Sequence, residues 1–181
     1  MARADMTAPR YPSLYQVNTK VWLAEISGLL KRKATLDDIP DASLDDFVKK
    51  GFDWVWFLSV WTTGDLGQRI SRAHSVWRKE FEETLHDLRE EDIAGSGFAI
   101  TDYHVHPELG GDEALHRLRE RMHKRGLKLM LDFVPNHMGP DHLWVRDHPE
   151  YFVQGTQGDI QLAPQNYFES AQEHSDLIFA Y

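Results

Sequence analysis

The sequence predicts an α/β fold built around a parallel sheet. Two helix-like segments are each followed by a buried strand, residues 54–58 in the first case and residues 127–134 in the second. The second strand ends abruptly in polar side chains. Helices that alternate with buried strands imply a parallel sheet, and right-handed crossovers leave a barrel or a doubly wound sheet as the common outcomes.

The first helix is expected just before residue 51. Leu44, Phe47 and Val48 recur at helical spacing, and Gly51 follows where a helix often ends in a left-handed conformation. The run Trp-Val-Trp-Phe-Leu at residues 54–58 then reads as a buried strand.

The second helix is expected to begin near Asp112, whose side chain is of a type that caps helices. Its inner stripe is predicted to be Leu115, Leu118 and Met122, and Gly126 follows the last turn. The strand of residues 127–134 comes next, and we expect both of its faces to be covered.

Polar groups follow that strand directly, with Asp132 inside its end and Asn136 and His137 just beyond Pro135. Proline cannot donate a backbone hydrogen bond, so it stops the ladder. The carboxyl ends of parallel strands are where α/β proteins place their chemistry, which makes this segment the first candidate site.

The remaining segments carry less pattern. Residues 61–96 form a charged insertion that we expect to be helical from about residue 72 to residue 88. Residues 138–181 are predicted to be loop-like because glycine and proline recur through them.

Composition bounds the partners and the compartment. The chain has 181 residues, no cysteine and a net charge of -9. An acidic chain is a poor match for nucleic acid or an anionic membrane, and no disulfide framework is available. We therefore expect a cytoplasmic protein with no nucleic-acid or membrane partner.

Three stretches in order resemble the α-amylase family of glycoside hydrolases. Residues 132–137, Asp-Phe-Val-Pro-Asn-His, resemble the family's first signature region at the end of the third barrel strand. Residues 97–103 with 106–110 resemble the segment before its second barrel helix, and residues 15–18 resemble its first strand.

The resemblance implies an incomplete TIM-type (β/α)8 barrel, covering about the first three strands and the start of the insertion after the third. Residues 1–10 are then a disordered tail, residues 11–137 belong to the barrel, and residues 138–181 begin the domain B-like insertion. A whole barrel takes about 250 residues. We expect the chain to need the missing carboxyl-terminal half, and to self-associate through open strand edges without it.

The family acts on α-linked glucosides and α-glucans by retaining hydrolysis or transglycosylation, which needs two carboxylates on opposite sides of the anomeric carbon. In the family these carboxylates follow later strands, so no catalytic residue is expected in this chain and the chain alone is predicted to be inactive. Whether the whole protein hydrolyses, transfers or isomerises stays open.

Substrate-binding residues are implied at three positions. His137 would donate a hydrogen bond to a sugar hydroxyl, Phe98 would offer an apolar platform where relatives usually have tyrosine, and Asp102 would join the same polar floor. Glycine at position 95, where several exo-acting members carry aspartate, speaks against exo action.

Asp132 and Asn136 are expected to be structural. In the family the residue that matches Asp132 pairs with an arginine located beyond residue 181, so a buried Asp132 would be costly or protonated here. Asn136 would hold the insertion, through calcium in many relatives. No cofactor is required, but calcium is possible, with three further oxygen donors at Asp141, Asp147 and Asp159.

Two other functions remain open. His104 and His106 have the His-x-His spacing of barrel metallohydrolases, although no further ligands are identifiable. A non-catalytic glucan binder is the other alternative, and its stacking surfaces would come from Trp61, Trp77, Trp144, Tyr151 and Tyr167.

Overall fold

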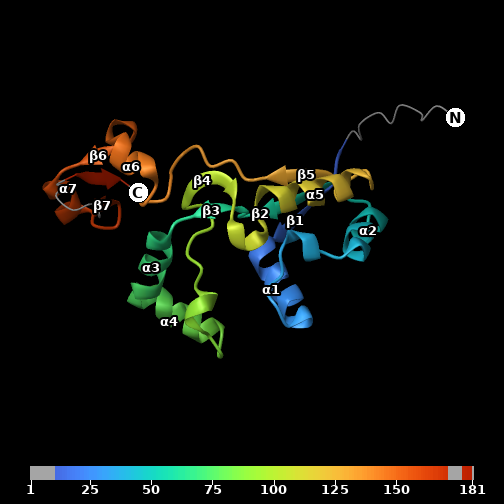
Figure 1. The fold of residues 1–181 in the computed structure, drawn as a ribbon. Coiled ribbons are helices and arrows are strands. Elements are labelled where there is room, and N and C mark those ends of the chain that lie inside the picture. Colours follow the sequence, from blue (N-terminus) through green and yellow to red (C-terminus); the bar gives the residue numbers. More distant parts are fainter. Residues whose placement is uncertain (1–10, 171–176, 181) are drawn as a thin grey trace. The chain divides into compact units, whose positions relative to one another are not determined.

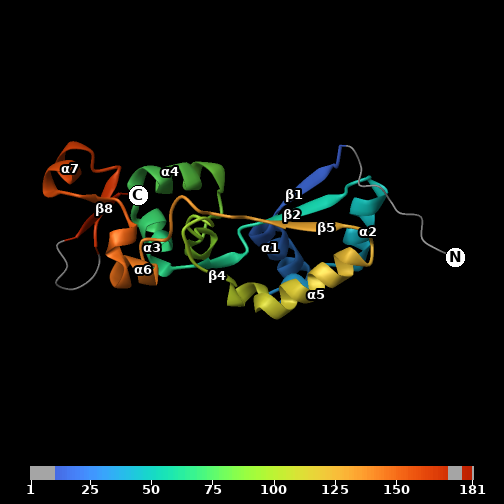
Figure 2. The same cartoon turned by 90° about the horizontal axis from the view of Figure 1, so that it is seen from above.

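A computed structural model describes residues 11–170 and 177–180, and the fold is shown in Figures 1 and 2. The expected disordered tail, residues 1–10, lies outside the described residues. The described residues divide into two compact units: unit 1 contains residues 11–60 and 104–133, and unit 2 contains residues 61–103, 134–170 and 177–180. The structure groups residues 61–103 with the carboxyl-terminal segment. The expected boundary between barrel and insertion, at residues 137 and 138, stays a prediction.

Unit 1 is built on a three-stranded parallel sheet with the order β1-β2-β5. Its strands are β1 (Leu14–Asn18), β2 (Trp54–Leu58) and β5 (Lys128–Leu131). Leu14 pairs with Trp54 and Trp54 with Lys128, and both ladders run in parallel from there. The predicted parallel α/β arrangement is confirmed, and the described residues form no closed barrel.

Helices cover one face of this sheet. Helix α1 (Thr19–Leu30) brings Trp22 over Phe57, and α2 (Asp41–Lys49) brings Phe47 against Tyr15. Helix α5 (Gly111–His123) buries Ala114, Leu118 and Met122. The short helices η1 (Leu36–Asp38) and η3 (Pro107–Leu109) complete this layer.

The other face of the sheet is not covered within unit 1, which corrects the expectation of strands buried on both sides. Burial alternates along β2, where Val55 and Phe57 are fully buried and Trp56 is only half-buried. Met130, the partner of Trp56 in the ladder, is exposed. The physical reason is that a parallel strand becomes apolar on both faces only when a second layer lies on each side.

Both predicted helices are present with altered details. Gly51 and Gly126 have positive φ angles, as the helix ends required. Asp112 is not the cap of α5: Gly110 holds that position, and the Asp112 carboxylate instead accepts a hydrogen bond from the N–H of Val105. The predicted cap was wrong because an aspartate at the second position of a helix can accept a hydrogen bond from the backbone of the preceding strand.

A ladder of ion pairs joins α5 to η1 and α2. Arginines four residues apart, on α5 and just past its end, face aspartates four residues apart on the other segment, at Asp37, Asp41 and Asp45. The nitrogen-to-oxygen distance is 2.7 Å in the pairs made by Arg117, Arg121 and Arg125. The matched spacing of one helical turn fixes the register between the two segments.

Unit 2 is built from short elements. Its first part holds β3 (Trp61–Thr63), α3 (Asp65–Ala73), α4 (Ser75–Thr84), η2 (Glu90–Asp92) and the first four residues of β4 (Ile100–Val105). Strands β3 and β4 pair with each other. The single helix expected over residues 72–88 is wrong: two helices meet at His74, whose Nδ1 accepts the N–H of Trp77 and so starts the second one.

The second part of unit 2 corrects the prediction that residues 138–181 are loop-like. It contains α6 (Leu143–Asp147), η4 (Pro149–Tyr151), β6 (Gln154–Gly155), α7 (Gln157–Leu162), β7 (Tyr167–Glu169) and β8 (Ile178–Ala180). The strands form an antiparallel sheet in the order β6-β8-β7 around the buried Phe179. These elements are too short to give a readable period. No helix among the described residues has the length and apolar character that crossing a membrane requires.

Candidate functional site

Asp132 lies buried at the carboxyl end of β5 in unit 1. Its carboxylate accepts hydrogen bonds from the indole N–H of Trp56, at 2.8 Å, and from the backbone N–H of Ser59, at 2.5 Å. Ser59 follows β2 with a φ of 62°, an unusual value for a residue other than glycine, and this turns its N–H toward the carboxylate. The expected cost of burying Asp132 without an arginine is therefore offset by N–H donors that the sequence did not reveal.

Asn136 and His137 lie beyond that strand, in unit 2. Both side chains are exposed and both line a cavity of about 550 Å³. Pro135 and Gly139 line the same cavity, so the whole turn after β5 contributes to its wall. The signature segment is thus divided between the units: Asp132 lies at the carboxyl end of β5 in unit 1, and His137 lines the cavity of unit 2.

Phe98 and Asp102 are not among the residues that line this cavity. Phe98 is 37% exposed and precedes β4, where its N–H donates to the Ser96 hydroxyl at 3.2 Å. Asp102 is an exposed residue of β4. The structure therefore does not gather the three predicted substrate-binding residues around one cavity, and the roles of Phe98 and Asp102 stay predictions.

Tyr103 was missed by the sequence reasoning. Its hydroxyl accepts a hydrogen bond from the backbone N–H of Val134 at 2.8 Å, which ties the end of β4 to the start of the turn that carries His137. The sequence around Tyr103 does not indicate this hydrogen bond, because the partner residue lies 31 positions away.

Asp141 fixes the same turn to the insertion that precedes it. Its carboxylate accepts the N–H of Leu66 at 2.9 Å, in the first turn of α3, where the residue at the cap position is Gly64 and has no side chain to do so. A Cβ atom on Gly64 would lie 2.1 Å from a carboxylate oxygen of Asp141. Glycine at position 64 is therefore required for this remote cap, which resists prediction from sequence because the two residues are far apart.

Gly139 makes a second connection between the two segments of unit 2. Its N–H donates to the carbonyl of Ile100 at 2.7 Å, and a Cβ atom there would lie 2.8 Å from the carbonyl oxygen of Ala99. The turn at residues 139–141 thus holds the wall of the cavity against β4 and α3.

His142 follows this turn and caps α6, since its Nδ1 accepts the N–H of Trp144 at 3.0 Å. Burial lowers the pKa of the His142 imidazole, and the carboxylates of Asp102 and Asp141 act in the opposite direction. The neutral imidazole matches its role, because only an unprotonated Nδ1 can accept this hydrogen bond.

The three aspartates named as possible calcium ligands are each engaged by a different neighbour. Asp141 accepts the N–H of Leu66, Asp147 pairs with Arg146, and Asp159 accepts hydrogen bonds from Thr156, the N-cap residue of α7. Within residues 11–170 and 177–180 no group of three or more His, Asp or Glu side chains is placed to hold a metal ion. The three aspartates therefore do not form one acidic cluster, and calcium at Asn136 stays a prediction.

His104 and His106 each have a local hydrogen-bond partner. Nδ1 of His104 lies 2.6 Å from the carboxylate of Asp112, and Nδ1 of His106 accepts the N–H of Glu108 at 3.2 Å. In the described part of the chain they do not join a group of three or more His, Asp or Glu side chains that could hold a metal ion, so the His-x-His spacing gains no support from the geometry.

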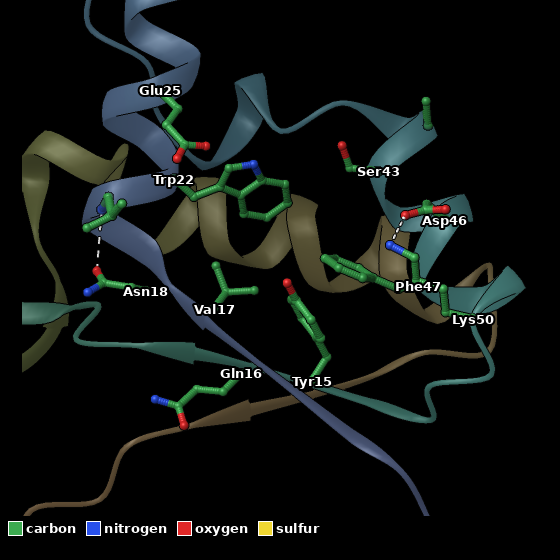
Figure 3. A pocket seen from close by; sticks show the side chains of 12 residues that line it. Tyr15, Gln16, Val17, Asn18, Trp22, Glu25, Ser43, Asp46, Phe47 and Lys50 are labelled. Atoms are coloured by element: carbon green, nitrogen blue, oxygen red, sulfur yellow. Dashed lines mark hydrogen bonds and ion pairs between the residues drawn. The ribbon is translucent and has the colours of Figure 1, made fainter.

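Unit 1 has a hollow of its own, on the helix side of the edge strand β1, with a volume of about 520 Å³. Figure 3 shows the side chains of Tyr15, Val17, Trp22 and Phe47 turned toward one space between α1 and α2. Charged groups also line it, including an ion pair of 2.7 Å between Asp46 and Lys50. Because β1 pairs with β2 alone, this hollow borders an open edge of the sheet.

Comparison with known proteins identifies the family of this fold. A model described as alpha amylase, catalytic domain, matches residues 79–175, more than half of the chain. An alpha-1,4-glucan:maltose-1-phosphate maltosyltransferase from Cereibacter sphaeroides is 30% identical over 179 residues, which cover 94% of this chain and 27% of that protein. One of the same name from Pseudomonas aeruginosa is 32% identical over 150 residues, which cover 78% of this chain and 20% of the relative.

Solved structures show the same fold. An α-amylase from Lactobacillus plantarum gives a TM-score of 0.53 at 22% identity, with 93% of this chain and 31% of that one covered. The trehalose-6-phosphate hydrolase of Bacillus licheniformis gives a TM-score of 0.59 at 16% identity, with 94% and 28% covered. The chain therefore spans about a third or less of the length of these relatives.

Proposed function

The chain belongs to the α-amylase catalytic-domain family, and we propose that it forms the amino-terminal part of a (β/α)8 barrel that acts on α-linked glucans. One observation carries the proposal: the parallel sheet β1-β2-β5 ends in the signature segment, which sets Asp132 in a polar floor and brings His137 to a cavity. In this role His137 donates a hydrogen bond to a sugar hydroxyl, and Asp132 holds the ends of β2 and β5 together.

Transfer of a maltosyl group is the reaction that the relatives favour over hydrolysis. The two maltosyltransferases match 94% and 78% of this chain, at 30% and 32% identity. Retaining transfer and retaining hydrolysis share a glycosyl-enzyme intermediate and differ in whether a sugar or water attacks it. Both need a nucleophile and an acid/base carboxylate beyond what this chain is expected to supply.

The open edges of unit 1 support the need for further barrel strands. β1 and β5 are the two outer strands of the sheet, and apolar side chains of Leu14 and Tyr15 are exposed at the β1 edge. We expect a further strand to pair with β1 and its helix to fill the hollow shown in Figure 3. Left open, such edges are templates for association, so light scattering of the chain alone should show oligomers.

The direct test is the activity of the chain and of a longer product. We expect the purified chain to release nothing from a chromogenic maltooligosaccharide, with Asp132→Asn as the control variant. A reading frame that continues past Tyr181 and encodes Gly-x-Arg-x-Asp would provide the longer product. That product should release phosphate from maltose 1-phosphate when an α-1,4-glucan is present as acceptor. Activity of the chain alone that Asp132→Asn abolishes would contradict the proposal.

In the longer product, His137→Ala should lower kcat by an amount equivalent to about 2 to 4 kcal/mol, because the lost hydrogen bond strengthens in the transition state. His116→Ala is the matched control, since His116 is an exposed residue of α5 that pairs with Glu120. Equal kinetics for the two variants would show that the signature segment has been assigned wrongly.

A further inference from the structure

The turn that carries His137 is buried at both ends and exposed between them. Val134 and Gly139 are buried, whereas Pro135, Asn136 and His137 are exposed and line the cavity of unit 2. Aromatic side chains from α4, α6 and η4 line the same cavity, at Trp77, Trp144 and Tyr151. β5 ends before this turn begins, so the ladder that pairs β5 with β2 does not extend to it. The position of His137 therefore depends on what holds the two buried ends.

Both buried ends of the turn are bonded to β4. The N–H of Val134 donates to the hydroxyl of Tyr103 at 2.8 Å, and the N–H of Gly139 donates to the carbonyl of Ile100 at 2.7 Å. The acceptor at Ile100 belongs to the backbone, so a substitution at that position does not remove it. Tyr103 instead supplies a side-chain acceptor, which only some residue types can offer. The start of the turn is therefore the end whose position depends on a particular side chain.

The ring of Tyr103 is oriented by a second aromatic side chain. Trp61 of β3 meets it edge-on with ring centroids 5.3 Å apart, and β3 pairs with β4. A tyrosine has only two side-chain dihedral angles, so a ring packed in this way carries its hydroxyl at a nearly fixed place. Val134 is 7% exposed, and a buried N–H without an acceptor is costly. Both partners of the hydrogen bond therefore favour the same arrangement of the turn.

We propose that Tyr103 is a positioning residue: by accepting the N–H of Val134, its hydroxyl sets the place from which the His137 imidazole donates to the sugar. The role of His137 in this statement rests on the proposed function. Tyr103 is not among the residues that line the cavity, so it acts through the turn. A hydrogen bond that strengthens in the transition state depends steeply on geometry, so a displaced imidazole lowers kcat more than it raises KM.

The positioning is tested first in the chain itself, by NMR. Tyr103→Phe keeps the ring against Trp61 and removes only the acceptor. Hydrogen exchange of the Val134 amide should become at least about tenfold faster, because the bond that protects it is lost. The imidazole signals of His137 should shift, whereas those of His148, which belongs to the same unit, should stay in place. A general loosening of unit 2 would move both histidines.

Two further chains separate positioning from a loss of structure. Tyr15→Phe removes a hydroxyl from β1 of unit 1, and should change neither the exchange of Val134 nor the signals of His137. 3-Fluorotyrosine at position 103 keeps the hydroxyl but makes it a weaker acceptor, so the Val134 amide proton should move upfield in a folded chain. This chain decides the point if Tyr103→Phe unfolds unit 2. Unchanged signals of Val134 and His137 in the altered chains would overturn the proposal.

The longer product tests whether Tyr103 acts through His137. Tyr103→Phe should lower kcat at least about tenfold and keep KM within about twofold. In a His137→Ala background the same change should lower kcat by less than about twofold, because the group that Tyr103 positions is already absent. An equal loss of kcat in both backgrounds would overturn the proposal, since Tyr103 would then act by another route.

The outcomes keep this proposal apart from the proposed function. An active longer product whose kcat does not respond to Tyr103→Phe would overturn the positioning role and leave the proposed function standing. An inactive longer product would instead overturn the proposed function, and the NMR measurements on the chain then decide whether Tyr103 positions His137.

Discussion

Unit 1 and unit 2 are stabilised in different ways. Most of the buried apolar side chains belong to unit 1, where Phe57, Leu118 and Met122 are fully buried between a regular sheet and its helices. Unit 2 buries few, among them Ile100 and Phe179, and neither α3 nor α4 contains a buried residue. In unit 2 the segments are instead joined by individual hydrogen bonds, such as those made by Asp141, Tyr103 and Gly139.

The difference places the large core in unit 1 and the accessible side chains of the cavity in unit 2. Regular βα units form a core that tolerates a fixed polar group such as Asp132, which is buried and hydrogen-bonded. The irregular unit presents its aromatic rings and His137 at a cavity, and exposed rings cannot contribute to a core at the same time. Local stability is therefore expected to be higher in unit 1.

Replacement of Phe57 is the strongest test of this contrast. Phe57→Ala removes a fully buried ring from the middle of β2 and should lower the free energy of unfolding by about 3 to 5 kcal/mol. Hydrogen exchange should show the loss of protection first in β1, β2 and β5. Equal loss of protection in β6, β7 and β8 would contradict the division into two units.

A glycine pair tests whether unit 2 depends on the Asp141 cap. Gly64→Ala forces the carboxylate away from Leu66 and should destabilise α3 by about 1 to 2 kcal/mol. Gly28→Ala in α1 is the matched control: no atom lies within 4 Å of the added Cβ, so it should stabilise by about 0.5 to 1 kcal/mol. Thermal melts read by circular dichroism give both values, and a neutral Gly64→Ala would show that the cap does not stabilise α3.

The response to acid sharpens the comparison in unit 2. Because burial lowers the pKa of His142 in the folded state, the unfolded chain takes up this proton first as the pH falls through the ordinary value of 6.5. Stability from this group is complete above that pH and is lost below it. His142→Asn keeps a capping side chain that does not titrate, so its free energy of unfolding should fall less between neutral pH and pH 5. A parallel decline in both proteins would exclude His142 as the sensitive group.

The smallest effect is expected from the ion-pair ladder of unit 1. The Arg121 guanidinium lowers the pKa of the Asp41 carboxyl and donates to the carbonyl of Ile39, yet the Asp41 side chain is exposed. Arg121→Gln should therefore cost about 0.5 kcal/mol in low salt and less in high salt. Arg119→Gln, on an exposed position of the same helix, is the control. A cost that does not change with salt would mean that packing of the side chain, not charge, is responsible.

The sequence by itself determined the parallel order of the regular part. Apolar spacing over α2 and α5 and the apolar runs of β2 and β5 are local signals, and the glycines at positions 51 and 126 mark the helix ends because positive φ suits glycine. The signature segment likewise indicated the place of Asp132 and His137, because motif residues are contiguous in the chain.

Tertiary structure alone decided the contacts between distant residues. Trp56 and Ser59 bind Asp132, Asp141 caps α3 across 75 residues, and Tyr103 binds Val134 across 31. The aromatic cavity also joins α4, α6 and η4, none of which has a readable period. Hydrogen bonds and ring contacts of this kind depend on where folded segments meet, and no local pattern of residues records that position.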